Sequence, residues 1–192
     1  RSALSGAEAR LVPDLAIAPA QRPIALALED AEQSLVARVF DFDTGRALFD
    51  LTGHPASAVK IVYDPRGALI ATASKDGQIR LWNARTGELV RQLEDGGALT
   101  TLEFDAAGTR LLSVAKNGRA TLRETDGWTT LATLGERAGA IEQARFVLGG
   151  ARVLSRAASD DPRANVASLW AARDGRLIGE LLGHAAPITR CE

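Results

Sequence analysis

The chain has 192 residues, 46% of them hydrophobic, and its 23 Lys and Arg against 24 Asp and Glu leave a net charge of −1. This balance argues against a nucleic-acid binder or a protein of anionic membrane surfaces, because either would carry a basic excess. The single cysteine, Cys191, excludes an internal disulfide and a cysteine-based metal site, and no apolar run approaches the ~20 residues that span a bilayer.

Short runs in which apolar and polar residues alternate follow one another along the whole chain. They are rich in β-branched residues and are separated by turns that contain Gly or Pro, so they predict β-strands. A helical period is not sustained, and only the stretch from Ser5 to Arg10 could hold a helical turn. In chain order, we expect strands at 15–17, 24–28, 35–40 and 47–51; at 59–63, 69–74, 79–82 and 89–93; at 99–104, 111–115, 120–122 and 130–134; and at 141–147, 153–157, 166–170 and 177–182.

A tight turn with a glycine recurs before the last strand of each group, at Gly45, Gly87, Gly127 and Gly175. Glycine suits such turns because it adopts a positive φ without a steric penalty. Four strands in each repeat of ~40–48 residues are typical of a β-propeller blade, whose stacked sheets bury each other's faces. The sequence therefore predicts an all-β fold of four-stranded antiparallel blades in an incomplete ring. The blades are expected at about 10–52, 53–94, 95–135 and 136–182, with the start of a further blade at 183–192.

The second repeat resembles a WD40 repeat. It opens with Gly53-His54, its first turn is DPRG at 64–67, and it ends on SKDGQIRLWN at 74–83. Gly183-His184 recurs about three repeats later, and Trp170 lies about two repeats after the tryptophan of the second repeat. Motif, order and spacing agree, so the chain is similar to the WD40-repeat β-propeller family and holds about four of its blades.

The resemblance implies a hydrogen-bond network inside the second blade, made by His54, Thr72 (or Ser74), Asp76 and Trp82. A buried Asp or His needs hydrogen-bond partners, and a buried indole N–H needs an acceptor, so a structural role accounts for all four residues. The alternative is a catalytic set of His54, Asp76 and Ser74. We disfavour it because both histidines of the chain stand at the family's structural position and no catalytic or cofactor motif is present.

The first and fourth repeats depart from the pattern of the second. Phe40 stands where the first blade should have a tryptophan, and Trp170 is kept in the fourth. An insertion at 159–165 precedes Trp170, and its composition predicts a surface loop. Its adjacent aspartates lack the ligand spacing of a calcium loop, so we expect no metal there.

The third repeat lacks the quartet, so packing must hold that blade. Arg123 replaces the tryptophan, and two orientations are open: into the blade against Glu103 or Glu124, or outward to solvent. The aligned residues, each 41 positions after those of the second blade, are Asp95 for His54, Asn117 for Asp76 and Arg123 for Trp82.

Three residues are candidates for contacts with a protein partner. Trp128 occupies a position filled by Arg or Glu in the other repeats, which predicts an exposed hot spot; the alternative is that a neighbouring loop half covers it. Lys75 and Lys116 occupy equivalent turns, on a face that binds partners in many propellers; the alternative is that both are simply solvated.

The resemblance implies a protein–protein interaction scaffold without intrinsic catalysis or a cofactor. The charge balance argues against a nucleic-acid or membrane partner, and a single cysteine fits a reducing compartment, so we expect a cytoplasmic protein. The alternative function is a sensor or regulatory propeller module of a larger bacterial signalling enzyme, such as a kinase, an NTPase or a caspase-like protease. Open blade edges predict self-association. Four blades would close into an eight-bladed ring as a dimer, whereas a piece of a longer protein would find its remaining blades in the missing sequence.

Overall fold

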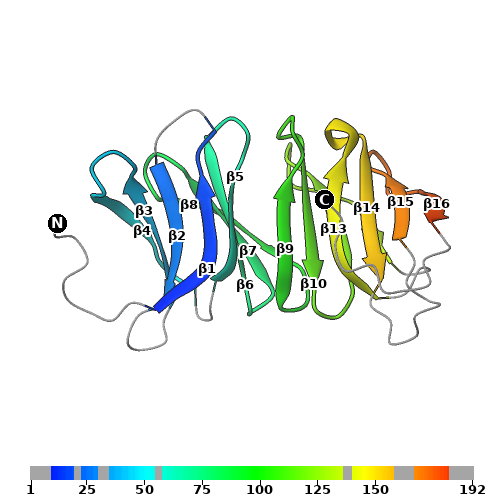
Figure 1. The fold of residues 1–192 in the computed structure, drawn as a ribbon, viewed down its shortest axis with the longest axis horizontal. Helices are drawn as coiled ribbons and strands as arrows, with labels where there is room; N and C mark the ends of the chain where they lie inside the picture. Colours follow the sequence, from blue (N-terminus) through cyan, green and yellow to red (C-terminus); the bar gives the residue numbers. More distant parts are fainter. Residues whose placement is uncertain are drawn as a thin grey trace. The chain divides into compact units, whose positions relative to one another are not determined.

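The computed structural model describes residues 10–19, 23–29, 35–54, 58–135, 140–157 and 167–181. Its strands form four sheets, each made of consecutive strands (Figure 1). The first two sheets contain β1 (Arg10–Ile17), β2 (Pro23–Glu29), β3 (Leu35–Asp41) and β4 (Ala47–Leu51), then β5 (Ala58–Tyr63), β6 (Leu69–Ser74), β7 (Gln78–Asn83) and β8 (Leu89–Glu94). The other two contain β9 (Leu99–Phe104), β10 (Arg110–Ala115), β11 (Ala120–Glu124) and β12 (Thr130–Leu134), then β13 (Ile141–Val147), β14 (Arg152–Ala157), β15 (Ala167–Ala171) and β16 (Leu177–Leu181).

The predicted all-β fold of antiparallel four-stranded sheets is confirmed, and none of the four sheets closes into a barrel. One expectation was wrong in part. Arg10 is the first residue of β1 and does not belong to a helical turn, and β1 begins five residues before the strand predicted at 15–17. The rest of that stretch, the insertion at 159–165 and the further blade predicted at 183–192 lie outside the described residues.

Each sheet has two ends, which differ in the connections between strands that they carry. The turn end carries the turn between the first and second strands and the turn between the third and fourth strands. The loop end carries the connection between the second and third strands. Because neighbouring strands are antiparallel, the two turns of one sheet always share the same end.

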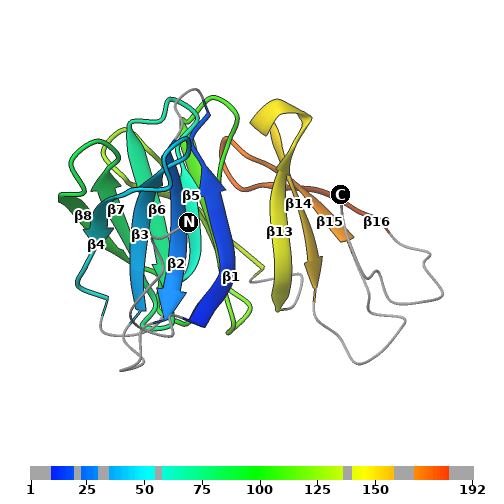
Figure 2. The same cartoon turned by 60° about the vertical axis from the view of Figure 1, so that its left-hand side comes forward.

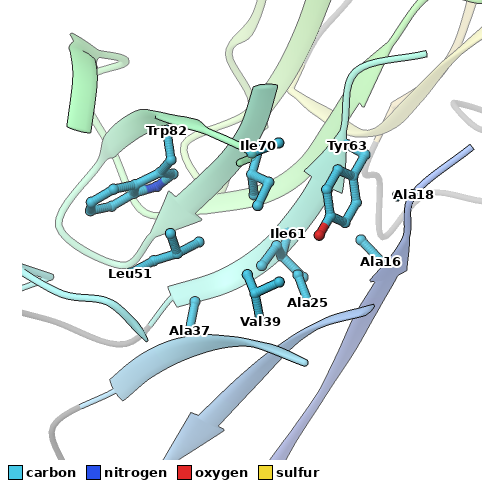
Figure 3. Packing of buried hydrophobic residues seen from close by; sticks show 11 residues of the cluster. Ala16, Ala18, Ala25, Ala37, Val39, Leu51, Ile61, Tyr63, Ile70 and Trp82 are labelled. Carbon is cyan, nitrogen blue, oxygen red and sulfur yellow. The ribbon is translucent and has the colours of Figure 1, made fainter. Parts of the chain in front are cut away.

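The chain forms two compact units, residues 1–102 and 103–192, and the boundary falls inside β9. The first unit holds the first and second sheets, which bury a common apolar cluster (Figure 3). Ala25 and Val39 from the first sheet are fully buried in it with Ile70 from the second. Tyr63 contributes its ring to the same cluster, and burial raises the pKa of its hydroxyl to about 12.

The second unit holds the cluster between the third and fourth sheets, and Figure 2 shows β13 to β16 side by side in order. Leu112 and Leu122 lie on one side of this cluster, and Val153 and Trp170 on the other. The turn between β15 and β16 packs against β12. A Cβ placed on Gly175 would lie 2.1 Å from Cβ of Ala132, so only a glycine fits there. In the first unit a Cβ placed on Gly87 would lie 2.6 Å from Cδ2 of Phe49, on β4.

In each unit, a carboxylate on the first strand of one sheet accepts a hydrogen bond from the main chain of the following sheet. Asp14 accepts a hydrogen bond from the N–H of Ile61 at 2.7 Å and from Nζ of Lys60 at 3.0 Å. Glu103 accepts one from the N–H of Phe146 at 3.1 Å. Both bonds fix the register of neighbouring first strands, because a slip by one residue would leave the carboxylate without its donor.

Within the residues described, no helix is long and apolar enough to cross a membrane.

Candidate functional site

The interior of the second sheet contains a chain of polar side chains, and three of the four predicted residues are bonded in sequence. Nε1 of Trp82, on β7, donates to Oγ1 of Thr72, on β6, at 2.8 Å. Nε2 of His54 lies 2.9 Å from the same oxygen. Between the two hydroxyl candidates of the sequence, Thr72 is the one that His54 and Trp82 share.

Asp76 is connected to His54 through Arg80, a residue that the sequence analysis did not single out. Nη1 of Arg80 lies 2.9 Å from Nδ1 of His54, and its Nη2 donates to Oδ2 of Asp76 at 2.9 Å and to Oε1 of Gln78 at 3.0 Å. The side chains of Arg80 and Asp76 are 3% and 15% exposed. The sequence did indicate that Arg80 joins this network, because it stands two residues before Trp82 and alternate residues of a strand share a face.

The donors and acceptors in this network fit one protonation state of His54. A guanidinium only donates, so Nδ1 of His54 accepts from Arg80, and the proton of the neutral ring is on Nε2, which donates to Thr72. The hydroxyl of Thr72 then accepts two hydrogen bonds and donates its own to the main-chain oxygen of Arg80 at 3.4 Å.

The electrostatics of the site keep His54 neutral and Asp76 charged. Burial, together with the positive charge of Arg80, lowers the pKa of His54 to about 4, although Asp76 opposes this. Burial works to raise the pKa of Asp76, but the hydrogen bonds from Arg80 and from the N–H of Gln78 outweigh it and leave that pKa below its ordinary value. At neutral pH the network therefore contains one ion pair and one neutral histidine.

The third sheet keeps the same geometry with other residues. Nη1 of Arg123 donates to Oγ of Ser113 at 3.3 Å, and the hydroxyl of Ser113 donates to the main-chain oxygen of Thr121 at 3.4 Å. These residues stand 41 positions after Trp82, Thr72 and Arg80, so each replaces its counterpart in the second sheet. Arg123 is 5% exposed, and of its two predicted orientations the inward one is found.

The fourth sheet repeats the bond between a tryptophan and a hydroxyl. Nε1 of Trp170, on β15, donates to Oγ of Ser155, on β14, at 2.7 Å, and both side chains are buried. The hydroxyl on the second strand of a sheet therefore accepts from the third strand in three consecutive sheets, whether the donor is an indole or a guanidinium.

The three predicted partner contacts differ in exposure. Lys75 and Lys116 are exposed at the loop ends of their sheets, in the turns after β6 and β10. Trp128 is half-buried, and its ring meets Phe104 edge to face with centroids 6.4 Å apart. Of the two readings of Trp128, the structure places it partly covered, and the cover is a side chain of β9.

Two side chains of the catalytic alternative, those of His54 and Ser74, are closed to a substrate. His54 is 6% exposed and Ser74 is fully buried, and every polar atom of His54 is engaged with Thr72 or Arg80. General acid–base chemistry requires the catalytic group to reach a substrate proton directly or through one water. No group of three or more His, Cys, Asp or Glu in the described part of the chain could hold a metal ion.

Comparisons with known proteins fall on this part of the chain. The family model "WD domain, G-beta repeat" matches residues 45–83, which contain the network of the second sheet. Over 72 residues the chain is 36% identical to eukaryotic translation initiation factor 3 subunit I of Neosartorya fischeri, Aspergillus terreus and Pyricularia oryzae. Each match covers 38% of this chain and 21% of the relative, so the chain matches about a fifth of the length of these curated relatives. The chain therefore contains a WD40 repeat at residues 45–83, and each of its four sheets has the four consecutive antiparallel strands of a propeller blade.

Proposed function

We propose that the chain is a protein–protein interaction scaffold built from WD40 repeats, with no catalytic step of its own. One observation carries the proposal. An apolar residue recurs three positions after the turn glycine, on the outermost strand of three sheets. Leu48, Val90 and Ile178 hold this position and are 49%, 56% and 42% exposed. Apolar side chains that are repeatedly left in water are typical of surfaces that other proteins cover.

The buried network supports the same function. Its hydrogen bonds tie His54 to β6 and β7 and engage both ring nitrogens of His54. A hydrogen-bonded polar network inside a sheet makes the sheet rigid, and a rigid surface binds a partner at a lower entropic cost. The name of the fungal relatives, a subunit of an initiation factor, supports partners that are themselves proteins.

Three finer points belong to the same proposal. We propose a cytoplasmic location, no nucleic-acid or membrane partner, and self-association through the open edges of the sheets. The alternative function, a regulatory module of a larger bacterial signalling enzyme, depends on sequence that flanks this chain. A kinase or phosphate-loop motif in that sequence would favour it.

Site-specific photo-crosslinking in the cells that make the protein tests the scaffold function. A benzophenone amino acid replaces Leu48, Val90 or Ile178 in turn, and mass spectrometry identifies the proteins attached after illumination. Gln92 serves as a matched control, because it is an exposed polar residue of the same outer strand as Val90. We expect discrete protein adducts from the apolar positions and fewer from Gln92. Adducts at none of the three positions would contradict the proposal.

A further inference from the structure

Leu148, in the turn between β13 and β14, is unusual for a leucine both in its exposure and in its backbone conformation. Its side chain is 76% exposed, and its φ is 53°, in the left-handed region that a side chain with a Cβ avoids. In the corresponding turns of the second and third sheets, the carboxylates of Asp64 and Asp105 bond the main chain of the turn. Val147 stands at that position in the fourth sheet and has no such group. The fold does not require a leucine here, and strain held at an exposed residue points to a function.

Three arginines lie in or beside the two turns at this end of the fourth sheet. The two turns at the turn end of the fourth sheet are joined by the hydrogen bond from the N–H of Ala172 to the oxygen of Ala151, at 3.2 Å. Nη1 of Arg152 donates to the same oxygen at 3.0 Å. The main-chain oxygen of Arg176 accepts from the N–H of Ala171, which is the register partner of Arg152. Arg173 completes the group from the β15–β16 turn.

The charge of this end differs from that of the other three turn ends. Three arginines, Arg152, Arg173 and Arg176, face one aspartate, Asp174, which the exposed Arg173 bonds at 3.1 Å. In the other sheets, the described turn residues carry at least as many carboxylates as cations. These residues are Asp41, Asp43 and Arg46 in the first sheet; Asp64, Arg66, Arg85 and Glu88 in the second; and Asp105, Arg110, Glu124 and Asp126 in the third.

We propose that the turn end of the fourth sheet, made by Leu148, Arg152, Arg173 and Arg176, binds an acidic protein segment that carries an apolar side chain. This inference rests on the proposed scaffold function and names one of its docking surfaces and the chemistry of its partner. The local positive charge stands out against a chain whose net charge is −1, so complementarity selects an acidic partner. The exposed leucine favours a segment that also carries an apolar residue over a simple polyanion. Burial of the leucine side chain adds to the binding free energy only when an apolar group of the partner covers it.

The two kinds of contact have separate roles. The arginines attract an acidic segment over a distance of about one Debye length, roughly 8–10 Å in physiological salt, and they set the rate of encounter. The exposed side chain of Leu148 provides the contact that excludes water. The cost of its left-handed conformation is offset when the partner buries the side chain.

The experiment measures the binding of a fluorescein-labelled acidic peptide, Asp-Glu-Glu-Leu-Phe-Glu-Glu-Asp, to the 192-residue chain by fluorescence anisotropy. Two further probes are the same peptide with Ser in place of Leu and Phe, and single-stranded DNA. We expect the first peptide to bind, and the serine peptide to bind about tenfold more weakly, as the loss of one or two buried apolar groups implies. Salt should weaken the binding of both peptides.

Two variants and two matched controls locate the surface. Leu148→Asn removes the apolar group and relieves the strain, because asparagine accepts a positive φ more readily. It should weaken peptide binding about tenfold while its melting temperature stays equal to or above that of the wild type. Arg176→Glu should weaken binding by a similar factor. Phe42→Asn and Arg46→Glu, at an exposed apolar residue and at the equivalent turn arginine of the first sheet, should leave binding unchanged.

Four results would overturn the inference, and three of them concern the variants and the DNA probe. The first is an affinity of Leu148→Asn for the peptide within twofold of the wild type. The second is a lower melting temperature for this variant, which would make Leu148 a structural residue. The third is DNA binding as tight as peptide binding with the same dependence on Arg176. Absence of peptide binding would also overturn it, yet would leave the crosslinks at Leu48 and Val90 untouched, so the two proposals fail separately.

Discussion

Nη1 of Arg80 lies 2.9 Å from Nδ1 of His54, in the interior of the second sheet. Because the guanidinium has no acceptor to offer, a proton on Nδ1 would face a donor and a positive charge. The arginine therefore holds the histidine neutral, and the neutral ring donates to Thr72 in turn. The ion pair of Arg80 with Asp76 and the hydrogen bond of Trp82 thus depend on one protonation state.

Stability should decrease as the pH falls from about 6.5 to about 4. The folded pKa of His54 is about 4, below its ordinary value of 6.5, so between these values the unfolded chain binds a proton that the folded chain does not. By linkage, the contribution is fully present above pH 6.5 and is lost on acidification, by roughly 3 kcal/mol at most. Urea unfolding between pH 4.5 and 7.5 measures it.

Substitution of His54 provides the control for this pH dependence. His54→Gln should flatten the pH dependence in this window. If His54→Gln kept the full slope, the acid sensitivity would come from other groups and the neutral state of His54 would be wrong.

Removal of Arg80 should destabilise the fold strongly. Arg80→Met keeps an unbranched aliphatic side chain but removes the guanidinium that bonds both Oδ2 of Asp76 and Nδ1 of His54. The loss of one partner from a buried pair costs about 3–5 kcal/mol, and water that reaches Asp76 lowers this toward the smaller value. Arg119→Met, at an exposed arginine of the third sheet, should change the free energy of unfolding by about 0.5 kcal/mol or less. Equal effects of both substitutions would contradict the network.

Two tryptophans should differ in their importance for stability. Trp82 is buried and bonded to Thr72, so Trp82→Ala should cost about 3–5 kcal/mol. Trp128 is half-buried and contacts the edge of Phe104, so Trp128→Ala should cost about 1 kcal/mol. Chemical denaturation of both variants measures the difference. A change within about 0.5 kcal/mol for Trp82→Ala would show that its burial does not hold the sheet.

The packing of the fourth sheet against the third can be isolated with two glycines of almost equal φ. Gly175 has a φ of 68° and would place a Cβ 2.1 Å from Ala132; Gly45 has a φ of 65° and nothing within 4 Å. Gly45→Ala should cost about 1–2 kcal/mol from the backbone alone. Gly175→Ala should cost about 1–3 kcal/mol more, because the methyl group overlaps Ala132. Equal unfolding energies would contradict the close contact.

The strands and their grouping could be predicted because they depend on the alternation of apolar and polar residues and on the spacing of the turn glycines. Both are local properties of the sequence. The orientation of Arg123 was left open, and its bond to Ser113 was not predicted. The position of Ser113, 41 residues after Thr72, contained the answer, since a side chain that replaces Trp82 reaches the same oxygen.

Arg80 and Trp128 show why the rest could not be predicted. An arginine on a strand is usually solvated, and only the three-dimensional position of His54 and Asp76 makes its burial favourable. Trp128 aligns with charged residues of other repeats, which predicts exposure. The main chain at Trp128 has a φ of 63°, and the ring of Phe104, on another strand, partly covers the tryptophan. The alternation of residues around Trp128 indicates neither feature.

The central claim is tested most directly by photo-crosslinking with two folded variants of the chain. The quantity compared is the yield of protein adducts. Val90→Asp places a charge on the apolar outer strand, and His54→Gln breaks the buried network. The scaffold account predicts that Val90→Asp loses the protein adducts formed at Leu48, on the outermost strand of the first sheet, while unfolding near the wild-type midpoint. It also predicts that His54→Gln keeps them at neutral pH, with lower stability. Full adducts from Val90→Asp, together with their loss from folded His54→Gln, would mean that the polar network is the working site and would contradict the account.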